Sequence, residues 1–515
     1  KQQASFNAYK FNTKRIVSTI FMIGTSWKNQ LFLDITGRND WSSALVYSYG
    51  TGNFSYFYPS VSGSWIITET FKDKLPKWVS FAKVRGSWAQ VGNDTSPYYI
   101  NSGYSVATYQ RGDKKIYGMT IPENMKSTNL KPERKNAWEV GLDWRFLDSR
   151  IGVDLTYYKE NTRNQIMTIN VPWESGVKEK LINAGNIQNS GIEIALNTTP
   201  IKKKQWQWDL NFTYTRNRNK IVELSPDVTS YINLDGAANY GNYRIASVAK
   251  VGSDYGMLMS DSWIKTDEKT GKPVVGYTNK FRTVYYKRGG TVKEVGSMLP
   301  NFLGSLNSTL RWKDLSLYVL FDARFGGYVA SYNSRYATAY GFSGETEKYR
   351  KGMTWTSKYA NAQDKVFTDG FIPDVVFDAG TIVTTPGGTN QDVSGMTYQE
   401  AYEKGYVEPA HLQSAAYFKN SWGTGVINDD WFKKINYIAL REITLSYNVP
   451  TKISSYIGAK NLSLSFTGRN LAYLLNTAPN HENPESVRGT GAAQFRMRSF
   501  MPYTASYLFT LNATF

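Results

Sequence analysis

Two histidines, His411 and His481, are the side chains best suited to acid–base or nucleophilic chemistry in this chain, which has no cysteine. A Ser-His-Asp site, as in surface phospholipases and proteases, would need one of them beside a serine and a carboxylate, and nothing in the sequence places such groups together. A zinc site is equally unexpected, because two histidines without cysteine give a low ligand density. We therefore expect no enzyme, no cofactor and no metal site.

Two other strings look at first like ligand-binding loops. Asn428-Asp429-Asp430 offers oxygens that calcium accepts, but the spaced Asp/Asn, the Gly and the terminal Glu of a calcium loop are missing. Gly387-Gly388-Thr389 has no Lys-Ser/Thr after it and is not a phosphate loop. A solvated turn is the better interpretation of the acidic string.

Aromatic side chains in long polar segments are the better candidates for ligand contacts, because sugars and peptides stack on rings that have a few hydrogen-bonding groups around them. Each of these rings is also suited to packing within its own loop. The candidate substrate-binding residues are Tyr98, Tyr99, Trp263, Tyr332, Trp355 and Trp422.

Aromatic residues make up 15% of the chain, more than a soluble enzyme needs to fill its core. A bilayer gives one reason, since Tyr and Trp place an apolar ring among acyl chains and a polar edge among headgroups. No run of about 18 apolar residues exists, which excludes a transmembrane helix but not a closed barrel. The net charge of +18 comes from scattered Lys and Arg without a nucleic-acid-binding motif. Anionic lipid headgroups or an acidic partner explain this charge as well, and we expect no nucleic-acid partner.

Alternation of apolar and polar residues recurs along most of the chain, in segments of about ten residues that can cross a bilayer at a tilt. In 138–146 and 206–215, Trp, Leu, Val, Phe and Tyr alternate with charged residues, amides, Gly and Thr, and 302–312 and 462–467 repeat the pattern. This pattern predicts an all-β fold, a transmembrane antiparallel β-barrel, with about fourteen strands in this chain.

The connections between these segments alternate between short and long. Turns such as 147–150 are short, whereas about 40 residues follow Val91, roughly 80 follow Asn217 and about 100 follow Gly326, against about 2 to 6 in a compact soluble domain. This asymmetry is typical of an outer-membrane barrel, in which the short side is periplasmic. We therefore interpret residues 1–515 as one portion of a barrel, with folded extracellular loops near 92–130, 165–186, 219–299, 327–433 and 472–500.

The last ten residues, 506–515, form an amphipathic segment that ends on an aromatic residue, Phe515. A terminal aromatic on a final strand is typical of the signal read by the barrel assembly machinery, so we expect Phe515 to act as this signal. At the other end, Lys1-Gln2-Gln3 does not begin a signal peptide. We expect that an N-terminal part has been removed or lies outside this sequence.

Residues 130–133, followed by 138–143, form an L-x-P-E … E-x-G-L-D string, and 183–193 form an N-x-G-x-x-x-N-x-G-x-E string. Together these strings resemble the SusC/RagA family of TonB-linked outer-membrane proteins. Trp41 departs from the R-x-D-G-S-S string of many members, which have Gly at this position. Further matches to the family run to both ends of the chain, at 38–43, 58–60, 84–88, 440–447 and 468–471.

The resemblance implies a 22-stranded barrel filled by an N-terminal plug, with this chain as the C-terminal part of the wall. It implies active import of an oligomeric nutrient, an oligosaccharide or a peptide, across the outer membrane of a Gram-negative bacterium. The implied partners are a SusD-like surface lipoprotein over the long loops, the TonB/ExbB/ExbD complex acting through the missing N-terminal part, and outer-membrane lipid. A dimer of transporter–lipoprotein pairs is a further implication. The inward carboxylates Glu139, Asp143 and Glu193 are expected to pair with Arg and Lys in the lumen or with the plug.

Two other functions stay open on the sequence. A passive, porin-like channel is the main alternative, because fourteen is an even number of strands that can close by itself. A surface enzyme or an adhesin built on a barrel is the third. The sequence upstream of Lys1 discriminates between the first two, since a plug supports the transporter and a signal peptide leading directly into Lys1 contradicts it.

Overall fold

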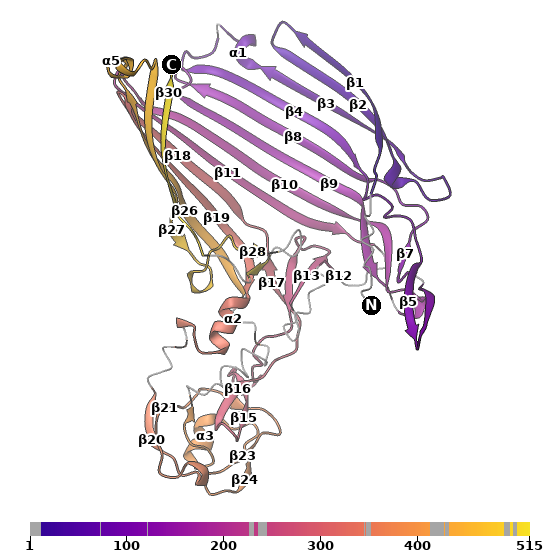
Figure 1. Cartoon of the computed structure of the whole chain (residues 1–515), viewed down its shortest axis with the longest axis vertical. Helices are drawn as coiled ribbons and strands as arrows, with labels where there is room; N and C mark the ends of the chain where they lie inside the picture. The colour runs from indigo at the N-terminus through magenta and orange to yellow at the C-terminus, as the bar shows by residue number, and fades with distance from the viewer. Residues whose placement is uncertain are drawn as a thin grey trace.

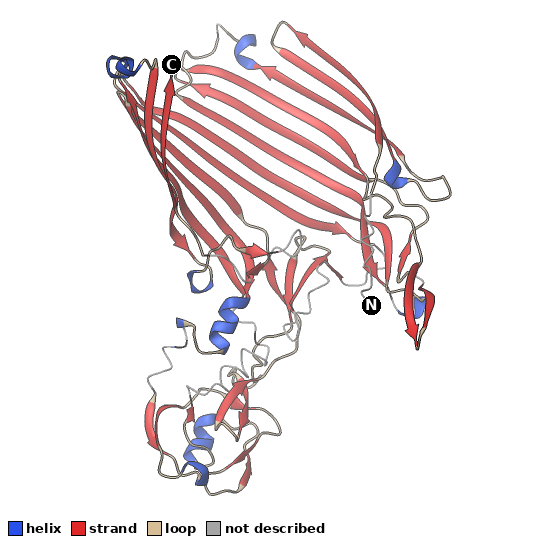
Figure 2. Ribbon diagram, viewed as in Figure 1, coloured by secondary structure: helices blue, strands red, loops and turns tan. Residues whose placement is uncertain are grey.

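Figures 1 and 2 show one broad, twisted sheet with a smaller folded region projecting from one end of its strands. Helices are few and short, and they lie at strand ends and in the projecting region (Figure 2). The structure is a computed structural model that describes residues 12–72, 74–120, 122–171, 173–225, 231–234, 245–344, 346, 352–411, 427, 432–488, 495–497 and 502–515.

Thirteen strands follow one another in the main sheet, each hydrogen-bonded antiparallel to the next along the chain's order, where the sequence predicts about fourteen. All of the connections between neighbours are therefore up-and-down, as in outer-membrane barrels. The thirteen are β1 (Ile16–Trp27), β2 (Leu31–Ser42), β3 (Ser55–Ile66), β4 (Val79–Asn93), β8 (Glu133–Phe146), β9 (Ile151–Asn170), β10 (Glu179–Lys202), β11 (Trp206–Glu223), β18 (Phe302–Trp312), β19 (Leu315–Ser331), β26 (Phe432–Val449), β27 (Asn461–Asn476) and β30 (Ser506–Thr514).

The register of the sheet gathers apolar side chains on one face, which we call the outward face. Trp206 pairs with Trp312 and Phe212 with Leu306, and every second residue of β11 and β18 points to this same face. Phe212 is 40% exposed and Leu306 37% exposed. Large apolar side chains left uncovered across a whole sheet face are expected where lipid, rather than protein, covers them.

Short connections lie at one end of the sheet and long ones at the other (Figure 1). Two to four residues join β1 to β2, β8 to β9, β10 to β11 and β18 to β19. The tight turn after β8 places Leu147, Asp148 and Ser149 in the left-handed region, with φ between 54° and 61°. Slightly longer connections at this end carry α1 (Ile67–Thr70) and α5 (Thr451–Ser454).

One expected loop is much shorter than the sequence indicates. The predicted loop at 165–186 reduces to residues 171–178, because β9 continues to Asn170 and β10 already begins at Glu179. The two strands stay paired through this stretch, with Ile166 opposite Asn183 and Ile169 opposite Lys180. The alternation fails as a signal here because both faces of the strands are covered by other loops and carry apolar residues.

The long connections at the other end contain secondary structure of their own. Between β4 and β8 lie the β5–β6 hairpin (Ser105–Arg111, Lys114–Thr120) and β7 (Asn124–Lys126), which pairs with β10. Residues from the β11–β18 connection form a four-stranded sheet of β12 (Tyr231–Asn233), β13 (Ile245–Lys250), β14 (Met257–Ser260) and β17 (Lys293–Ser297).

The projecting region joins two connections that are far apart in sequence. Strand β15 (Val274–Thr278) of the β11–β18 connection pairs in parallel with β22 (Val376–Phe377) of the β19–β26 connection. Phe377 and Tyr398 are fully buried in its core, and Tyr398 lies on α3 (Tyr398–Glu403), which begins with a capping box formed by Thr397 and Glu400. One hydrophobic core therefore lies in the loops, and further buried clusters form where the loop ends of the main strands pack against them.

The two outermost strands of the sheet each have a single neighbour in the described part of the chain. Strand β1 pairs with β2, and β30 pairs with β27. The sheet described here is therefore an open one, with a free edge at each end. Among the described residues, no helix is both long and apolar enough to cross a membrane.

Candidate functional site

Charged side chains gather on the inward face of the sheet, opposite the apolar face. Arg85 of β4 donates two hydrogen bonds to Asp154 of β9, at 2.9 and 3.0 Å, and a third to the hydroxyl of Thr156 at 2.6 Å. Its guanidinium also lies 3.8 Å from Glu139 of β8. A fork-to-fork contact of this kind fixes the orientation of both partners more firmly than a single ion pair does.

The sequence makes room for this cluster with a glycine. Gly141 pairs directly with Arg85 across β4 and β8, and a Cβ atom at Gly141 would lie 2.6 Å from Arg85 Nε. Any side chain there would displace the guanidinium. The glycine of the E-x-G-L-D string thus has a physical role, which is to let the arginine lie flat against the wall.

The carboxylates that the sequence places on the inward face behave differently from one another. Glu139 faces Arg85, as stated above, and Asp143 lies 3.3 Å from Arg145 on its own strand. The prediction that they pair with lumen cations is confirmed for these two. For Glu193, no ion pair forms with any residue that the structure describes.

A second inward cluster ties the wall to the β27–β30 connection at the loop end. Arg441 of β26 donates to Asp322 of β19 at 2.7 Å and to Glu485 of the connection at 2.6 and 2.7 Å. Tyr473 donates to the same glutamate at 2.8 Å. Burial acts to raise the pKa of Glu485, but the hydrogen bonds from Arg441 and Tyr473 outweigh it and hold that pKa below its usual value.

Uncharged polar groups occupy the inward face between these clusters. Asn219 donates to Asn189 at 2.7 Å, Asn189 donates to Glu160 at 3.1 Å, and the Tyr158 hydroxyl donates to Asn217 at 3.2 Å. A face of paired charges and amides offers many hydrogen-bonding groups with little net charge. Such a face suits the lining of a passage for a polar solute, and it has the chemistry of binding rather than of bond cleavage.

His411 lies in the projecting region beside a carboxylate. Its Nδ1 is 3.1 Å from Asp369 Oδ1, and its ring packs against those of Trp355 and Phe367, at 4.8 and 4.6 Å between centroids. Among the described residues, no serine hydroxyl bonds to the ring, and no three His, Asp or Glu side chains are grouped as metal ligands. The other histidine, His481, ends a short 3-10 turn, and Asn428 to Asp430 lie outside the described residues.

The structure does not bring the candidate aromatic residues together. Tyr98 is 60% exposed, and its neighbour Tyr99 bonds to Thr168 and lies under Lys126 Nζ, 4.4 Å from the ring centroid. Trp263 packs on Phe432 elsewhere in the loops, with Nε1 donating to Ser260 O.

Two of the other candidates are packing residues. Tyr332 is buried at the start of α2 (Tyr332–Ala339), and Trp355 is stacked on Phe367 while donating to Glu408. Their alternative role, packing within a loop, is what the structure shows. Trp422 lies outside the described residues. Phe515 follows β30 at the short-turn end and is exposed, and its carbonyl accepts from Lys460.

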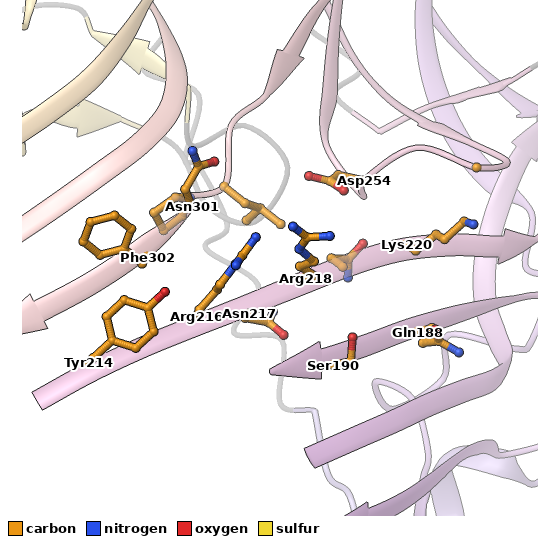
Figure 3. A pocket seen from close by; sticks show the side chains of 14 residues that line it. Gln188, Ser190, Tyr214, Arg216, Asn217, Arg218, Lys220, Asp254, Asn301 and Phe302 are labelled. Carbon is orange, nitrogen blue, oxygen red and sulfur yellow. The ribbon is translucent and has the colours of Figure 1, made fainter. Parts of the chain in front are cut away.

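A pocket of about 780 Å³ at the loop end of β10 and β11 has no counterpart in the sequence analysis. It is lined by the basic side chains Arg216, Arg218 and Lys220, which Figure 3 shows rising from one strand. The sequence does contain a signal for this basic group. The even-numbered residues of β11 are aromatic or apolar from Trp206 to Tyr214, and the next three even-numbered residues are basic.

Comparison with known proteins agrees with this architecture. The chain is 24% identical over 468 residues to TonB-dependent receptor P26 of Formosa agariphila. This alignment covers 89% of the chain and 41% of that receptor. It is 28% identical over 270 residues to TonB-dependent receptor SusC of Bacteroides thetaiotaomicron, covering 50% of this chain and 26% of SusC. The fold matches the RagAB peptide transporter with a TM-score of 0.65 and 16% identity, over 98% of this chain and 48% of that one.

The chain spans less than half the length of each of these three proteins. The model of the TonB dependent receptor-like β-barrel family matches residues 21–293, which is more than half of the sequence. With one lipid-compatible face, one polar face and up-and-down strands, the chain belongs to the TonB-dependent receptor β-barrel family of the outer membrane.

Proposed function

We propose that the protein containing this chain actively imports an oligomeric nutrient across the outer membrane of a Gram-negative bacterium. The observation that carries the proposal is the two-faced sheet, whose inward face holds clusters such as Arg85 with Asp154 and Arg441 with Asp322. The chain contributes the C-terminal part of the barrel wall, and upstream strands of the same protein complete the barrel. A plug inside it, coupled to TonB, ExbB and ExbD, provides the energised gate.

The open sheet supports a wall completed by further strands over a self-contained porin. A fourteen-stranded channel built from this chain alone would need its first and last strands to pair, whereas β1 and β30 are the two free edges of the described sheet. A plug inside the barrel would find ion-paired and amide side chains to bind on the inward face, rather than an open ring of one charge.

Oligosaccharides and peptides are the two substrate classes we propose. The match to the RagAB peptide transporter favours a peptide, and the relationship to SusC leaves an oligosaccharide as the second class. Tyr98 and Tyr99 are the residues of this chain that we assign to substrate contact, because both rings are accessible at the loop end, 60% and 40% exposed. A SusD-like lipoprotein would close over these loops, and two such pairs would form a dimer.

Uptake in cells tests the proposal. A strain lacking the gene is complemented with the wild-type gene, in the presence and absence of TonB, and supplied with fluorescent peptides and oligosaccharides of graded length. We expect uptake of one class to require both the gene and TonB. Uptake that persists without TonB would identify a passive channel, and cleavage of the probe that depends on His411 would identify a surface enzyme.

A further inference from the structure

The outward face of the sheet carries a group of cations just beyond its apolar band, and we infer that this group binds the phosphate of a lipid headgroup. The inference requires only that the barrel lies in a membrane and does not depend on import. We call the group the outward basic patch, and its members are Arg134, Lys159, Arg163, Arg216, Arg218 and Lys220.

The register places these cations on the lipid side of the wall. Arg216, Arg218 and Lys220 continue the series of every second residue that includes Phe212 and Tyr214. On β10 the partners of Arg218 and Lys220 are Ser190 and Gln188. They lie on the same face as the apolar Leu196, Ile194 and Ile192, nearer the loop end of the strand. Figure 3 shows Tyr214, Arg216 and Arg218 on one side of the β11 ribbon, and Ser190 on the neighbouring strand.

Two aromatic pairs mark the height of the apolar band on β11 and β18. Trp206 stacks on Trp312 near the short turns, with 5.6 Å between ring centroids, and Tyr214 contacts Phe302 at the other end, at 5.4 Å. Ten residues of β18 separate the two levels, about 34 Å along the strand, and a tilt of about 40° reduces this to about 26 Å of height. That height matches an outer-membrane apolar band of about 25 Å. Arg216 lies one outward position beyond Tyr214, at the level of headgroups.

The ion-paired charges near this level point inward. Lys135, which points inward, is paired with Glu160, and Glu139 also points inward. Within the described residues, no member of the outward basic patch forms an ion pair with a carboxylate.

Two of the patch's arginines face each other directly. Arg134 and Arg163 are partners across β8 and β9, a like-charge arrangement that destabilises a sheet unless an anion lies between the two side chains. Phosphates of a lipid leaflet would supply that anion at this level of the wall.

The pocket gives the patch its most specific part. Its volume of about 780 Å³ is lined by two guanidinium groups and one ammonium group, together with Ser190 and Asn301, and Asp254 is the one carboxylate among its lining residues. Guanidinium forks bind phosphate oxygens in pairs, and a hydroxyl and an amide complete the shell. The ring of Tyr214 at the base of the pocket matches the boundary between headgroup and acyl chain. Because the patch faces lipid, a phosphorylated lipid fits it better than a soluble acidic protein.

Binding of defined lipids to the purified, delipidated full-length protein tests the inference by native mass spectrometry. The lipids are bisphosphorylated lipid A, the same lipid without phosphates, and phosphatidylcholine, with inorganic phosphate as a soluble competitor. The pocket variant is Arg216→Gln with Arg218→Gln and Lys220→Gln. A matched control removes three cations at the other end of the same two strands, through Lys202→Gln at the end of β10 and Lys203→Gln and Lys204→Gln in the short turn.

We expect the pocket variant to bind phosphorylated lipid at least about tenfold more weakly than the wild type, and the control variant to bind it normally. The dephosphorylated lipid should bind all three proteins equally weakly. Equal losses in both variants, or no loss in the pocket variant, would overturn the inference.

Two further measurements distinguish lipid binding from binding of a free anion and from misfolding of the variant. Inorganic phosphate that displaces the lipid at concentrations comparable to the lipid's own would show a free-anion site and overturn the lipid assignment. If the glutamine variant does not reach the folded, heat-modifiable form on gels, the charge-retaining variant Arg216→Lys with Arg218→Lys takes its place. We expect that variant to keep phosphate-dependent binding but with reduced affinity, and unchanged affinity for all three lipids would contradict the role of the two guanidinium forks.

Discussion

Replacing Arg441 by Gln should release the β27–β30 connection from the barrel wall without unfolding the sheet. Arg441 bonds to Asp322 on the wall and to Glu485 on the connection, at 2.7 and 2.6 Å. The arginine side chain is only 18% exposed, but both carboxylates are more than a third exposed. A fully buried pair would be worth several kcal/mol, and solvent screening reduces the coupling of Arg441 with Glu485 to about 1 kcal/mol.

Hydrogen exchange measured by mass spectrometry gives this number directly. A loss of about 1 kcal/mol should speed exchange in residues 478–488 by about fivefold, since the population of the open connection rises by that factor. A double-mutant cycle with Glu485→Gln isolates the pair, and the two substitutions should be clearly less than additive. Arg311→Gln, which breaks the 3.0 Å pair with Asp209 on another part of the sheet, is the matched control. Additive effects, or equal acceleration in the control, would refute the anchoring role of Arg441.

Three further predictions concern the same connection, the inward face and the chain end. Burial raises the pKa of Glu482 to about 7 despite a hydrogen bond from Ser331. The buried site favours the protonated carboxyl group of Glu482. The docked connection is therefore most stable below the ordinary glutamate pKa of 4.5, and it loses this stability as the pH rises to the folded pKa of about 7. The free energy of opening of residues 478–488, obtained after division by the intrinsic exchange rate at each pH, should therefore fall between about pH 4.5 and 7 in the wild type and not in Glu482→Gln, and a pH-independent free energy in the wild type would contradict this. Gly141→Val should displace the Arg85 guanidinium, whose Nε would be 2.6 Å from the new Cβ, and lower the thermal midpoint of the barrel by a few degrees, whereas an unchanged midpoint would show that the cluster adapts freely. Deleting Phe515 should reduce the amount of assembled protein in the outer membrane, and Phe515→Tyr should restore it; normal assembly of the deletion would remove the residue's assigned role.

The sequence predicts the wall of this protein far better than its loops, and the reason is physical. A strand between lipid and lumen must alternate, so Trp206 to Thr215 shows its structure in its residue types. Alternation breaks where the strand has a bulge, as it does near Leu440 to Glu442 of β26, and the strand count from sequence is correspondingly approximate.

The loop structure depends on contacts that no local pattern contains. Strand β22 is two residues long and pairs with β15, about a hundred residues earlier in the chain. Trp355 and Tyr332 were reasonable ligand candidates by residue type, yet their neighbours in space make them packing residues. The outward basic patch, in contrast, was readable from the change at Tyr214 from apolar to basic residues at every second position.

Site-directed spin labelling gives the most direct test of the barrel wall itself, because this chain has no cysteine and any cysteine upstream of it can be replaced by serine. Single cysteines placed in turn at residues 206 to 215 of the full-length protein, in lipid vesicles, can carry a nitroxide label whose collisions with oxygen and with a water-soluble nickel complex report lipid and water contact. The account predicts a period of two, with oxygen favoured at Phe212 and other even positions and nickel favoured at Thr213 and other odd positions. A uniform profile, or one with the opposite phase, would contradict the assignment of the apolar face to lipid and the polar face to the lumen.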